Sequence, residues 1–315
     1  MQPGKSLKTK FIMLCGLPGS GKTTLAQTLC DDNTLWLSSD SLRKELYGSE
    51  EEQGKPNVVF GEMKRRTLCA LNEGRNVLYD ACNISSKRRR ALLCEMTKYD
   101  CSKECIICAT PYATCLKRSS LRSRVVSEAV IKRMYLNWNT PFYYEGWDKI
   151  SIFYSEGAKS SLGTIQSFIG KYDSFEQDNP YHLETLGNHM RKTGDYLVKN
   201  LGYAKTDNTV LAGYLHDCGK PFTKSFLDSR GNLDDKAHYY LHQAAGAYDA
   251  LFFDLDPKTT DDILEISCLI GLHMDPYNWS EEKTRLKYRK LLGEKLYLQL
   301  MDLNEADDSS CVRAE

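Results

Sequence analysis

The chain has 315 residues, a length that favours two globular domains over one. Its 42 basic and 42 acidic side chains cancel, so its net charge provides no general attraction to nucleic acid or membranes. No apolar stretch approaches the roughly 18 to 20 residues of a membrane span, and the N-terminal sequence lacks the features of a signal peptide. We therefore expect a cytoplasmic protein that binds any anionic substrate through local basic patches.

Strand and helix patterns alternate through the first half of the chain. Short apolar runs predict strands at 11–15, 34–38, 76–80 and 104–109. Helical patterns lie at 58–73, 85–98, 112–121 and 127–138. Strands that alternate with helices of this length predict an α/β domain, in which a parallel sheet has helices on both faces.

The second half of the chain is predicted to be helical almost throughout, which indicates an all-α domain. A polar segment that ends in Asn-Pro, at 170–180, is interpreted as the linker. It separates a first domain at 1–169 from a second domain at 181–315. The helical patterns beyond the linker lie at 181–200, 207–216, 237–253, 260–273 and 281–306.

Twelve cysteines are scattered along the chain, several of them inside apolar runs. In a cytosolic protein of this size, we expect them to be buried reduced thiols. The densest group is Cys101, Cys105 and Cys108. No second pair follows this group at zinc spacing, so a metal role is the less favoured interpretation.

A phosphate-binding loop is predicted between the first strand and the helix that follows it. Gly-Leu-Pro-Gly-Ser-Gly-Lys-Thr fits the pattern Gly-x-x-x-x-Gly-Lys-Thr. Lys22 is expected to reach the β and γ phosphates of ATP or another nucleoside triphosphate, and the Thr23 hydroxyl to coordinate Mg²⁺. The residues expected to bind the nucleotide are Gly16, Gly19, Ser20, Gly21, Lys22, Thr23 and Thr24.

Two acidic residues follow predicted strands, at the sheet edge where ligands bind in open α/β folds. Asp40 is a candidate to accept a proton from an attacking hydroxyl, and Arg43, one turn later, to hold an anion. Asp40 is equally suited to cap the next helix, and the two roles are compatible. Asp80 is a candidate to assist Mg²⁺ through water, with a purely structural role as the alternative.

Arginines lie close together on a later predicted helix. Arg118 and Arg122 are four residues apart, and Arg124 and Arg133 follow them. Arginines on a helical lid can close over a triphosphate and neutralise charge in the transition state. A solvated, basic helix face is the alternative interpretation.

Taken together, these motifs resemble the 5′-hydroxyl polynucleotide kinase family over roughly residues 10–155. The resemblance rests on the phosphate-binding loop, Ser-Asp-Ser-Leu-Arg, Asp-Ala-Cys-Asn, Lys-Arg-Ser-Ser-Leu-Arg-Ser-Arg and a later Glu-Gly-Trp. It implies that Asp40 is the general base for the 5′-hydroxyl and that Arg43 binds the phosphate of the acceptor. By the same resemblance, Arg118 and Arg122 are the arginines of the lid.

All six histidines lie at residue 182 or later, so imidazole-based metal chemistry is confined to the second half of the chain. The central feature is His216-Asp217, which follows an apolar helical stretch. The flanking histidines include His189, His238, His242 and His273. With a late Asp, such a set suits divalent transition metals such as Mn²⁺, Co²⁺, Ni²⁺ or Fe²⁺. Two adjacent metals would activate water and bind a phosphoryl group, which suits phosphoester hydrolysis.

The segments around these residues resemble the HD phosphohydrolase superfamily. They are Asn179–His189, Leu215–Pro221, His238–Ala247 and Leu269–His273. The resemblance implies that one metal is bound by His189, His216, Asp217 and a terminal Asp. It implies that the second metal is bound by His242 and His273, with Asp217 as the bridge.

The remaining residues of the second half are assigned on the same resemblance. The ending Leu-Asn-Glu-Ala-Asp favours Asp307 over Asp302 as the last metal ligand. Lys220 would contact the phosphate of the substrate. His182 and His238 are not expected to be ligands, although either is a candidate to contact substrate.

A kinase and a phosphohydrolase in one chain predict repair of broken RNA. The pairing is similar to the bifunctional HD-domain polynucleotide kinases of RNA end healing, which implies RNA (or DNA) ends and ATP as substrates. The kinase would phosphorylate the 5′-hydroxyl, and the hydrolase would remove a 2′,3′-cyclic or 3′-end phosphate, leaving ends for an RNA ligase.

Two alternatives to this interpretation remain open. One is a small-molecule kinase fused to a nucleotide phosphohydrolase, and the other is a second domain that only regulates the kinase by binding a nucleotide. The complete ligand set argues against the regulatory alternative. The basic runs at 64–66 and 87–90 are candidates to bind a polynucleotide or are solvated helix faces.

Overall fold

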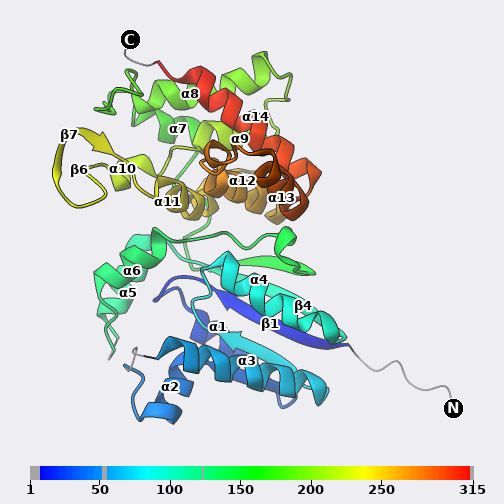
Figure 1. Cartoon of the computed structure of the whole chain (residues 1–315). Coiled ribbons are helices and arrows are strands. Elements are labelled where there is room, and N and C mark those ends of the chain that lie inside the picture. The colour runs from blue at the N-terminus through cyan, green and yellow to red at the C-terminus, as the bar shows by residue number, and fades with distance from the viewer. Residues whose placement is uncertain (1–7, 52–54, 123, 313–315) are drawn as a thin grey trace. The chain divides into compact units, whose positions relative to one another are not determined.

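The computed structural model describes residues 8–51, 55–122 and 124–312 (Figure 1). The chain divides into two compact units, of which the first comprises Met1–Lys132 and Pro141–Ser155 and the second Arg133–Thr140 and Glu156–Glu315. The division lies before the segment 170–180 that was expected to be the linker. That segment packs into the second unit, where the preceding Phe168 and Ile169 are buried.

The first unit is built on a five-stranded sheet with the order β2-β3-β1-β4-β5, in which every neighbouring pair is parallel. The strands are β1 (Thr9–Cys15), β2 (Thr34–Ser38), β3 (Asn76–Asp80), β4 (Cys101–Ala109) and β5 (Lys149–Tyr154). The edge strand β5 was not predicted, because its residues alternate only weakly between buried and exposed positions.

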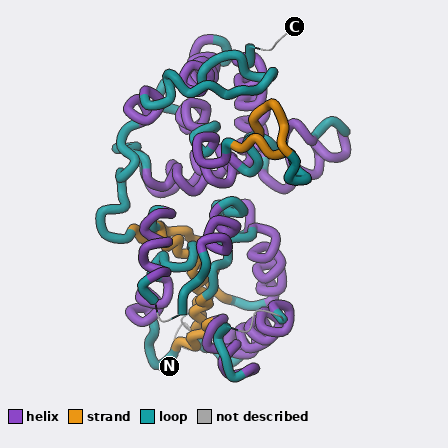
Figure 2. The backbone as a smooth tube through the Cα atoms, turned by 90° about the vertical axis from the view of Figure 1, so that its left-hand side faces the viewer, coloured by secondary structure: helices purple, strands orange, loops and turns teal. Residues whose placement is uncertain are grey.

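Helices flank this sheet (Figure 2). They are α1 (Lys22–Leu29), α2 (Ser39–Tyr47), α3 (Pro56–Asn72), α4 (Ser86–Glu95), α5 (Tyr112–Ser120) and α6 (Glu128–Tyr135), with short 3₁₀ turns at Met96–Lys98 and Tyr143–Glu145. The central strand β1 is apolar because both faces of the sheet are covered. Its Phe11 and Leu14 are fully buried, and the predicted α/β architecture is confirmed.

The second unit is helical, as predicted. Its helices are α7 (Ile165–Gly170), α8 (Leu186–Lys199), α9 (Asn208–Leu215), α10 (Lys220–Thr223), α11 (His242–Asp249), α12 (Thr260–Leu272), α13 (Glu282–Leu292) and α14 (Glu294–Ser310), with 3₁₀ turns at Ala250–Phe252 and Pro276–Asn278. Helices α8, α9, α12 and α14 pack together around fully buried residues. These include Leu197, Leu215, Leu269 and Leu303.

One part of the second unit departs from the helical prediction. An antiparallel hairpin of β6 (Ser225–Leu227) and β7 (Leu233–His238) replaces the start of the helix predicted at 237–253. Its turn forms because Asp228 accepts hydrogen bonds from the backbone of Arg230 and Asn232, and Gly231 adopts a left-handed conformation with φ of 85°.

None of the described helices is both long and apolar enough to cross a membrane. The twelve cysteines form no disulfide, as expected. The expectation that they are buried is only partly correct, because Cys69 and Cys94 are exposed.

Candidate functional site

The predicted phosphate-binding loop lies between β1 and α1, at the carboxyl edge of the sheet. Gly19 and Gly21 have φ of 83° and 90°, values that favour glycine. A Cβ atom at Gly19 would lie 2.5 Å from the carbonyl oxygen of Cys115, so the loop also needs glycine there for space. The Lys22 ammonium is folded back on the loop and donates to the carbonyl oxygens of Gly16 (3.0 Å) and Leu17 (2.8 Å).

A hydroxyl and a carboxylate meet beside this loop. The hydroxyl of Thr23 donates to Oδ2 of Asp80 at 3.2 Å, and Thr24 is exposed on the next position of α1. Asp80 ends β3 and is buried, which raises the pKa of its carboxyl. Oxygen ligands of this kind are the ones that Mg²⁺ prefers. The residues present therefore fit a nucleotide bound with magnesium.

Asp40 lies in the first turn of α2, just after β2. Its Oδ1 accepts from the guanidinium of Arg43 at 3.0 Å and from that of Arg124 at 2.9 Å. The side chain of Asp40 is half exposed, and the guanidinium of Arg43 is almost buried. Ser38 caps the helix by accepting from the backbone of Ser41, so Asp40 does not act as the cap. Its carboxylate is instead directed to two guanidinium groups.

The arginines predicted to form the lid lie on and just after α5. Arg118 and Arg122 are both exposed, and neither forms an ion pair with a carboxylate in the described part of the chain. Arg124, which follows them, is the arginine of this segment that pairs with Asp40. The sequence gave no reason to prefer Arg124, because the contact joins residues 84 positions apart.

A buried ion pair supports the Asp-Ala-Cys-Asn motif. Arg89 donates to Glu145 through two nitrogens, at 2.8 and 2.6 Å, and both side chains are excluded from solvent. Arg89 also donates to the carbonyl oxygen of Asn83 at 2.7 Å, and Trp147 donates to Glu145 at 2.9 Å. Arg89 therefore holds the turn after β3 and is no part of an exposed basic patch, unlike Lys87.

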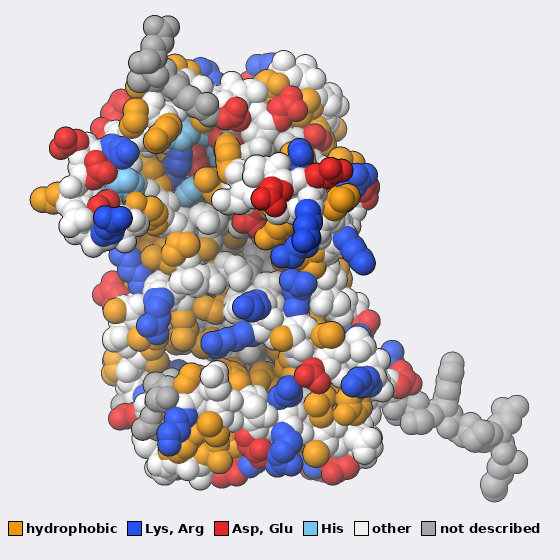
Figure 3. All heavy atoms as spheres, viewed as in Figure 1, with side chains coloured by type: hydrophobic (Ala, Val, Ile, Leu, Met, Phe, Trp, Pro, Cys, Tyr) orange, Lys and Arg blue, Asp and Glu red, His pale blue; other side chains and the backbone are white. Residues whose placement is uncertain are grey.

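Lys and Arg side chains do gather on the face of the first unit that Figure 3 presents, together with exposed apolar groups. Among the basic runs proposed from the sequence, Arg65 and Arg66 are paired with Glu62. Charge at that run is therefore partly neutralised, which weakens it as a polynucleotide surface.

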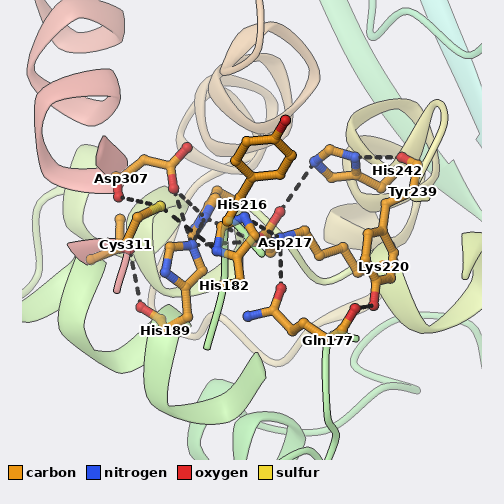
Figure 4. A network of polar contacts seen from close by, with 12 residues as sticks. Gln177, His182, His189, His216, Asp217, Lys220, Tyr239, His242, Asp307 and Cys311 are labelled. Atoms are coloured by element: carbon orange, nitrogen blue, oxygen red, sulfur yellow. Dashed lines mark hydrogen bonds and ion pairs between the residues drawn. The ribbon is translucent and has the colours of Figure 1, made fainter. Parts of the chain in front are cut away.

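In the second unit, four imidazoles and two carboxylates converge on one point, and we call them the His–Asp cluster. Its members are His189, His216, Asp217, His242, Asp307 and His273, of which Figure 4 labels the first five. All six are at least nine-tenths buried. They come from α8, the ends of α9 and α12, the start of α11, and α14. The structure thus brings together every metal ligand that the sequence predicted.

The cluster consists of two pairs of histidines on either side of Asp217. His189 and His216 bring their Nε2 atoms to 3.1 Å, and Oδ2 of Asp217 lies 3.3 and 3.2 Å from them. His242 and His273 bring their Nε2 atoms to 3.2 Å, with Oδ1 of Asp217 at 3.1 Å from His242. One carboxylate therefore faces both pairs, as a bridging ligand would.

The tautomers of three cluster histidines are fixed by the backbone. The Nδ1 atoms of His216, His242 and His273 lie 2.8, 2.8 and 2.7 Å from the carbonyl oxygen of the residue three positions earlier. Each Nδ1 therefore carries a proton, which leaves Nε2 as the ring nitrogen that would bind a metal. The Nδ1 of His189 is buried and has no such partner among the described residues.

Asp307 completes the cluster. Its Oδ1 lies 3.0 Å from Nε2 of His189, and its Oδ2 accepts from the hydroxyl of Tyr277 at 3.0 Å. Asp302, the alternative, accepts from Tyr203 at 2.5 Å instead. Burial alone would raise the pKa of Asp307, but the charge of His216 and hydrogen bonds from His189 outweigh it and lower that pKa. Nitrogen and carboxylate donors in this arrangement fit divalent transition metals.

Lys220 lies beside the cluster and is nearly fully buried. Its ammonium has three acceptors: Oδ2 of Asp217 at 2.6 Å, Oε1 of Gln177 at 2.8 Å and Nε2 of His182 at 3.4 Å. In this arrangement the three hydrogens of Lys220 point to protein groups. The ammonium is thus placed to hold Asp217, next to any substrate phosphate that reaches the cluster.

Several residues around the cluster were not predicted as metal ligands. Gln177 is almost completely buried and lies in the segment expected to be the linker, and Cys311 follows α14. His182 contacts both Lys220 and Cys311. His238 lies outside the cluster, at the end of β7, and pairs with Asp234, because the helix predicted at 237–253 begins only at His242. No local pattern marks these residues, because their contacts depend on the fold.

A glycine sets the spacing between two parts of the cluster. Gly219 packs against α11 so closely that a Cβ atom would lie 2.1 Å from the carbonyl oxygen of His242. The same atom would lie 2.7 Å from the backbone nitrogen of Gly246. The backbone at Gly219, two residues after Asp217, is therefore in direct contact with the backbone of α11, which begins at His242.

Two family models match the chain, one in each unit. Residues 11–141 match a family described as AAA domain, and residues 183–308 match a family described as HD domain. Among curated proteins, the chain is similar to the L-seryl-tRNA(Sec) kinase of Methanococcus maripaludis. The two are 26% identical over 209 residues, which cover 61% of this chain and 78% of that protein.

Solved structures give more distant similarities. The Pnkp1/Rnl/Hen1 RNA repair complex contains a chain with a TM-score of 0.36 and 19% identity, over 44% of this chain and 46% of that one. A second structure of the Pnkp1/Rnl/Hen1 complex has a TM-score of 0.31 and 22% identity, over 38% of this chain and 41% of the matched chain. A gluconokinase from Sinorhizobium meliloti 1021 has a TM-score of 0.35 and 12% identity, over 47% of this chain and 84% of the gluconokinase. This chain spans less than half the length of the matched RNA repair chains.

Proposed function

We propose that this chain, in which a P-loop kinase-like AAA domain is followed by an HD domain, heals broken polynucleotide ends. The kinase-like domain would transfer phosphate from ATP to a 5′-hydroxyl. The HD domain would remove a 2′,3′-cyclic phosphate or a 2′- or 3′-phosphate. One observation carries the proposal. The chain that contains the His–Asp cluster also contains a carboxylate, Asp40, that pairs with two guanidinium groups beside the phosphate-binding loop domain's sheet edge.

Phosphoryl transfer needs little covalent help from the protein, so positioning and charge decide it. Lys22 and the loop glycines would hold the β and γ phosphates, and Thr23 with Asp80 would hold Mg²⁺. Asp40 would accept the proton of the attacking hydroxyl. Its Oδ1 accepts from Arg43 and Arg124, and its Oδ2 would take the proton because it has no ion-pair partner among the described residues. Arg118 and Arg122 are exposed and able to cover the triphosphate.

Hydrolysis would take place at the His–Asp cluster. The residues that would hold two metals are His189, His216 and Asp307 on one side and His242 and His273 on the other, with Asp217 between them. When bound, the metals supply an activated water and charge that stabilises the phosphoryl oxygens. Lys220 fixes the orientation of Asp217 at 2.6 Å and adds positive charge beside the substrate.

The similarity to a kinase named for a tRNA substrate supports an RNA-linked hydroxyl as the acceptor. The products of the two reactions, a 5′-phosphate and a 3′-hydroxyl, are the ends that an RNA ligase joins. A ligase that acts downstream is therefore the partner that the proposal implies.

One assay with two labels tests the proposal. The full chain receives ATP, Mg²⁺ and Mn²⁺ with an oligoribonucleotide that has a 5′-hydroxyl and a 2′,3′-cyclic phosphate. We expect Lys22→Ala to lose 5′ phosphorylation at least 100-fold while hydrolysis is retained, because one charge on the transferring phosphate is worth about 10² to 10³ in rate. Asp217→Asn should show the opposite pattern. If the wild type modifies neither end but acts on nucleosides, nucleotides or an aminoacyl-tRNA, the proposal is wrong.

A further inference from the structure

We propose that Cys311, His182 and His189 form a separate site for one thiophilic divalent cation, such as Zn²⁺, beside the His–Asp cluster. Each of these residues places a potential ligand atom within 4.8 Å of the other two. Cys311 follows the end of α14, His182 precedes α8, and His189 lies within α8. The two-metal cluster itself contains no sulfur ligand, so this site differs from it in its chemical preference.

The spacing of two of these atoms is the spacing that a tetrahedral zinc site needs. The sulfur of Cys311 lies 3.6 Å from Nδ1 of His182. Bonds of about 2.3 Å to sulfur and about 2.0 Å to nitrogen, at a tetrahedral angle, put the two ligand atoms roughly 3.6 Å apart. The two ligand atoms therefore already have the separation that a bound cation requires.

We assign the second ring nitrogen of His189, Nδ1, to this cation. Its Nε2 faces His216 and Asp307, whereas its buried Nδ1 has no hydrogen-bond partner among the residues that the structure describes. The other three histidines of the cluster all satisfy Nδ1 with a backbone carbonyl. A buried polar atom without a partner is unfavourable, and a cation bound to it would remove that cost. The contrast within one cluster is the second observation that points to a ligand.

Two of the three ligands are more accessible to solvent than the members of the His–Asp cluster. His182 and Cys311 are half buried, unlike the members of the His–Asp cluster. Figure 4 shows Cys311, His182 and His189 on the side of the network that faces Asp307. Three protein ligands leave one tetrahedral position for water.

Binding would release protons in a defined way. Cys311 would bind as the thiolate, so the S–H bond that now donates to the carbonyl oxygen of Asp307 at 3.3 Å is lost. His189 would bridge two cations as an imidazolate when Nε2 is also occupied, and its second ring proton would leave to solvent. On His182, a cation at Nδ1 leaves the ring proton on Nε2, which faces the ammonium of Lys220. Lys220 would then keep only Asp217 and Gln177 as acceptors.

Cobalt binding to the full-length protein tests the site without an activity assay. We would titrate Co²⁺ into wild type and Cys311→Ser, then measure bound metal after desalting and the near-ultraviolet absorption of a cobalt–thiolate bond. We expect wild type to bind one more equivalent than Cys311→Ser and to show the thiolate band, which the variant lacks. His182→Gln should lose the same equivalent and the same band. Cys94→Ser, at an exposed cysteine of α4, is the matched control and should behave as wild type.

Wild type without a thiolate band, or Cys311→Ser with unchanged stoichiometry, would show that the contact between Cys311 and His182 is only a hydrogen bond. A band lost equally in Cys94→Ser would place the bound cobalt elsewhere and overturn the assignment. Because the readout is bound metal, its outcome is independent of whether the chain acts on polynucleotide ends.

Discussion

His189 and Asp307 meet with 3.0 Å between Nε2 and Oδ1, which joins helix α8 to helix α14 inside the second unit. Asp302 and Asp307 are separated by five residues of α14, or about 140° around the helix axis. Only one of them can therefore face His189. The Tyr277 hydroxyl fixes the other oxygen of Asp307, so the orientation of this carboxylate is determined on both sides.

This relationship predicts different results at the two aspartates of α14. Asp307→Asn should lower the affinity of the HD domain for Mn²⁺ by at least about 10-fold and reduce phosphoester hydrolysis, because a buried anionic ligand is lost. Asp302→Asn is the matched control, since the contact of Asp302 within the described residues is the hydrogen bond from Tyr203 and not one to the cluster. Isothermal titration calorimetry with Mn²⁺ measures both. Equal losses in the two variants would contradict the ligand assignment.

A second prediction concerns Arg124. The guanidinium of Arg124 pairs with Asp40 and would help to bind the phosphate of the acceptor. Arg124→Ala should then raise KM for a 5′-hydroxyl oligonucleotide roughly 10-fold. This factor corresponds to about 1.4 kcal/mol, the contribution of one charge-assisted hydrogen bond. KM for ATP should stay unchanged.

Lys117 is an exposed basic residue of α5 and provides the control for Arg124. Lys117→Ala removes the same charge from the same segment and should leave both KM values within twofold of wild type. Steady-state kinetics with oligonucleotide and ATP varied separately would make the comparison. A rise in KM for ATP alone would instead assign Arg124 to the triphosphate.

The buried ion pair of the first unit yields a prediction about stability. Arg89→Met leaves the carboxylate of Glu145 buried without its partner, which costs about 3 to 5 kcal/mol of unfolding free energy. Lys87→Ala, at an exposed position of the same helix, should change stability by less than about 0.5 kcal/mol. Urea unfolding followed by tryptophan fluorescence compares them. If Arg89→Met and Glu145→Gln together are no more stable than Arg89→Met alone, an unpaired charge is not the cause.

The second unit should lose stability as pH rises through neutrality. Burial raises the pKa of Asp249 from 3.8 to about 7, and the Tyr135 hydroxyl donates to its carboxyl at 2.8 Å. In the folded state the carboxyl binds its proton more tightly than in the unfolded chain, so its contribution is complete below about pH 4 and disappears as pH rises through 7. The difference amounts to roughly a few kcal/mol.

Asp249→Asn removes this titration and keeps an acceptor for Tyr135. The variant should therefore be more stable than wild type at pH 8, and the difference should shrink as the pH is lowered to 5. Thermal unfolding at several pH values is the measurement. A difference that is constant with pH would mean that Asp249 is ionised throughout.

The sequence predicted the features that depend on neighbouring residues. The phosphate-binding loop is a continuous motif, and the four predicted strands are apolar runs with polar boundaries. Strand β5 was not predicted, and the structure places it at the sheet edge, where Ile152 and Tyr154 are only partly buried. The β6–β7 hairpin escaped prediction because its turn depends on Asp228 and Gly231, within residues of mixed preference.

Long-range contacts explain the residues of the site that the sequence did not reveal. Gln177 and Cys311 lie in segments with no recognisable pattern, yet the fold places them against Lys220 and His182. Arg89 belongs to a basic run that predicts exposure, and its partner Glu145 is 56 residues away. The histidines were easier to assign, because that residue type is rare in the chain and its spacing matched a known set of ligands.

The close approach of Gly219 to α11 has a consequence for how the HD domain can change. Because backbone contacts backbone there, the spacing between the backbone that follows Asp217 and the start of α11 is set by the path of the chain. Substitutions elsewhere in the helical bundle can alter stability while the spacing between Gly219 and α11 stays constant. A single methyl group at position 219 would push these two backbones apart, and would so move the Asp217 carboxylate away from the second histidine pair.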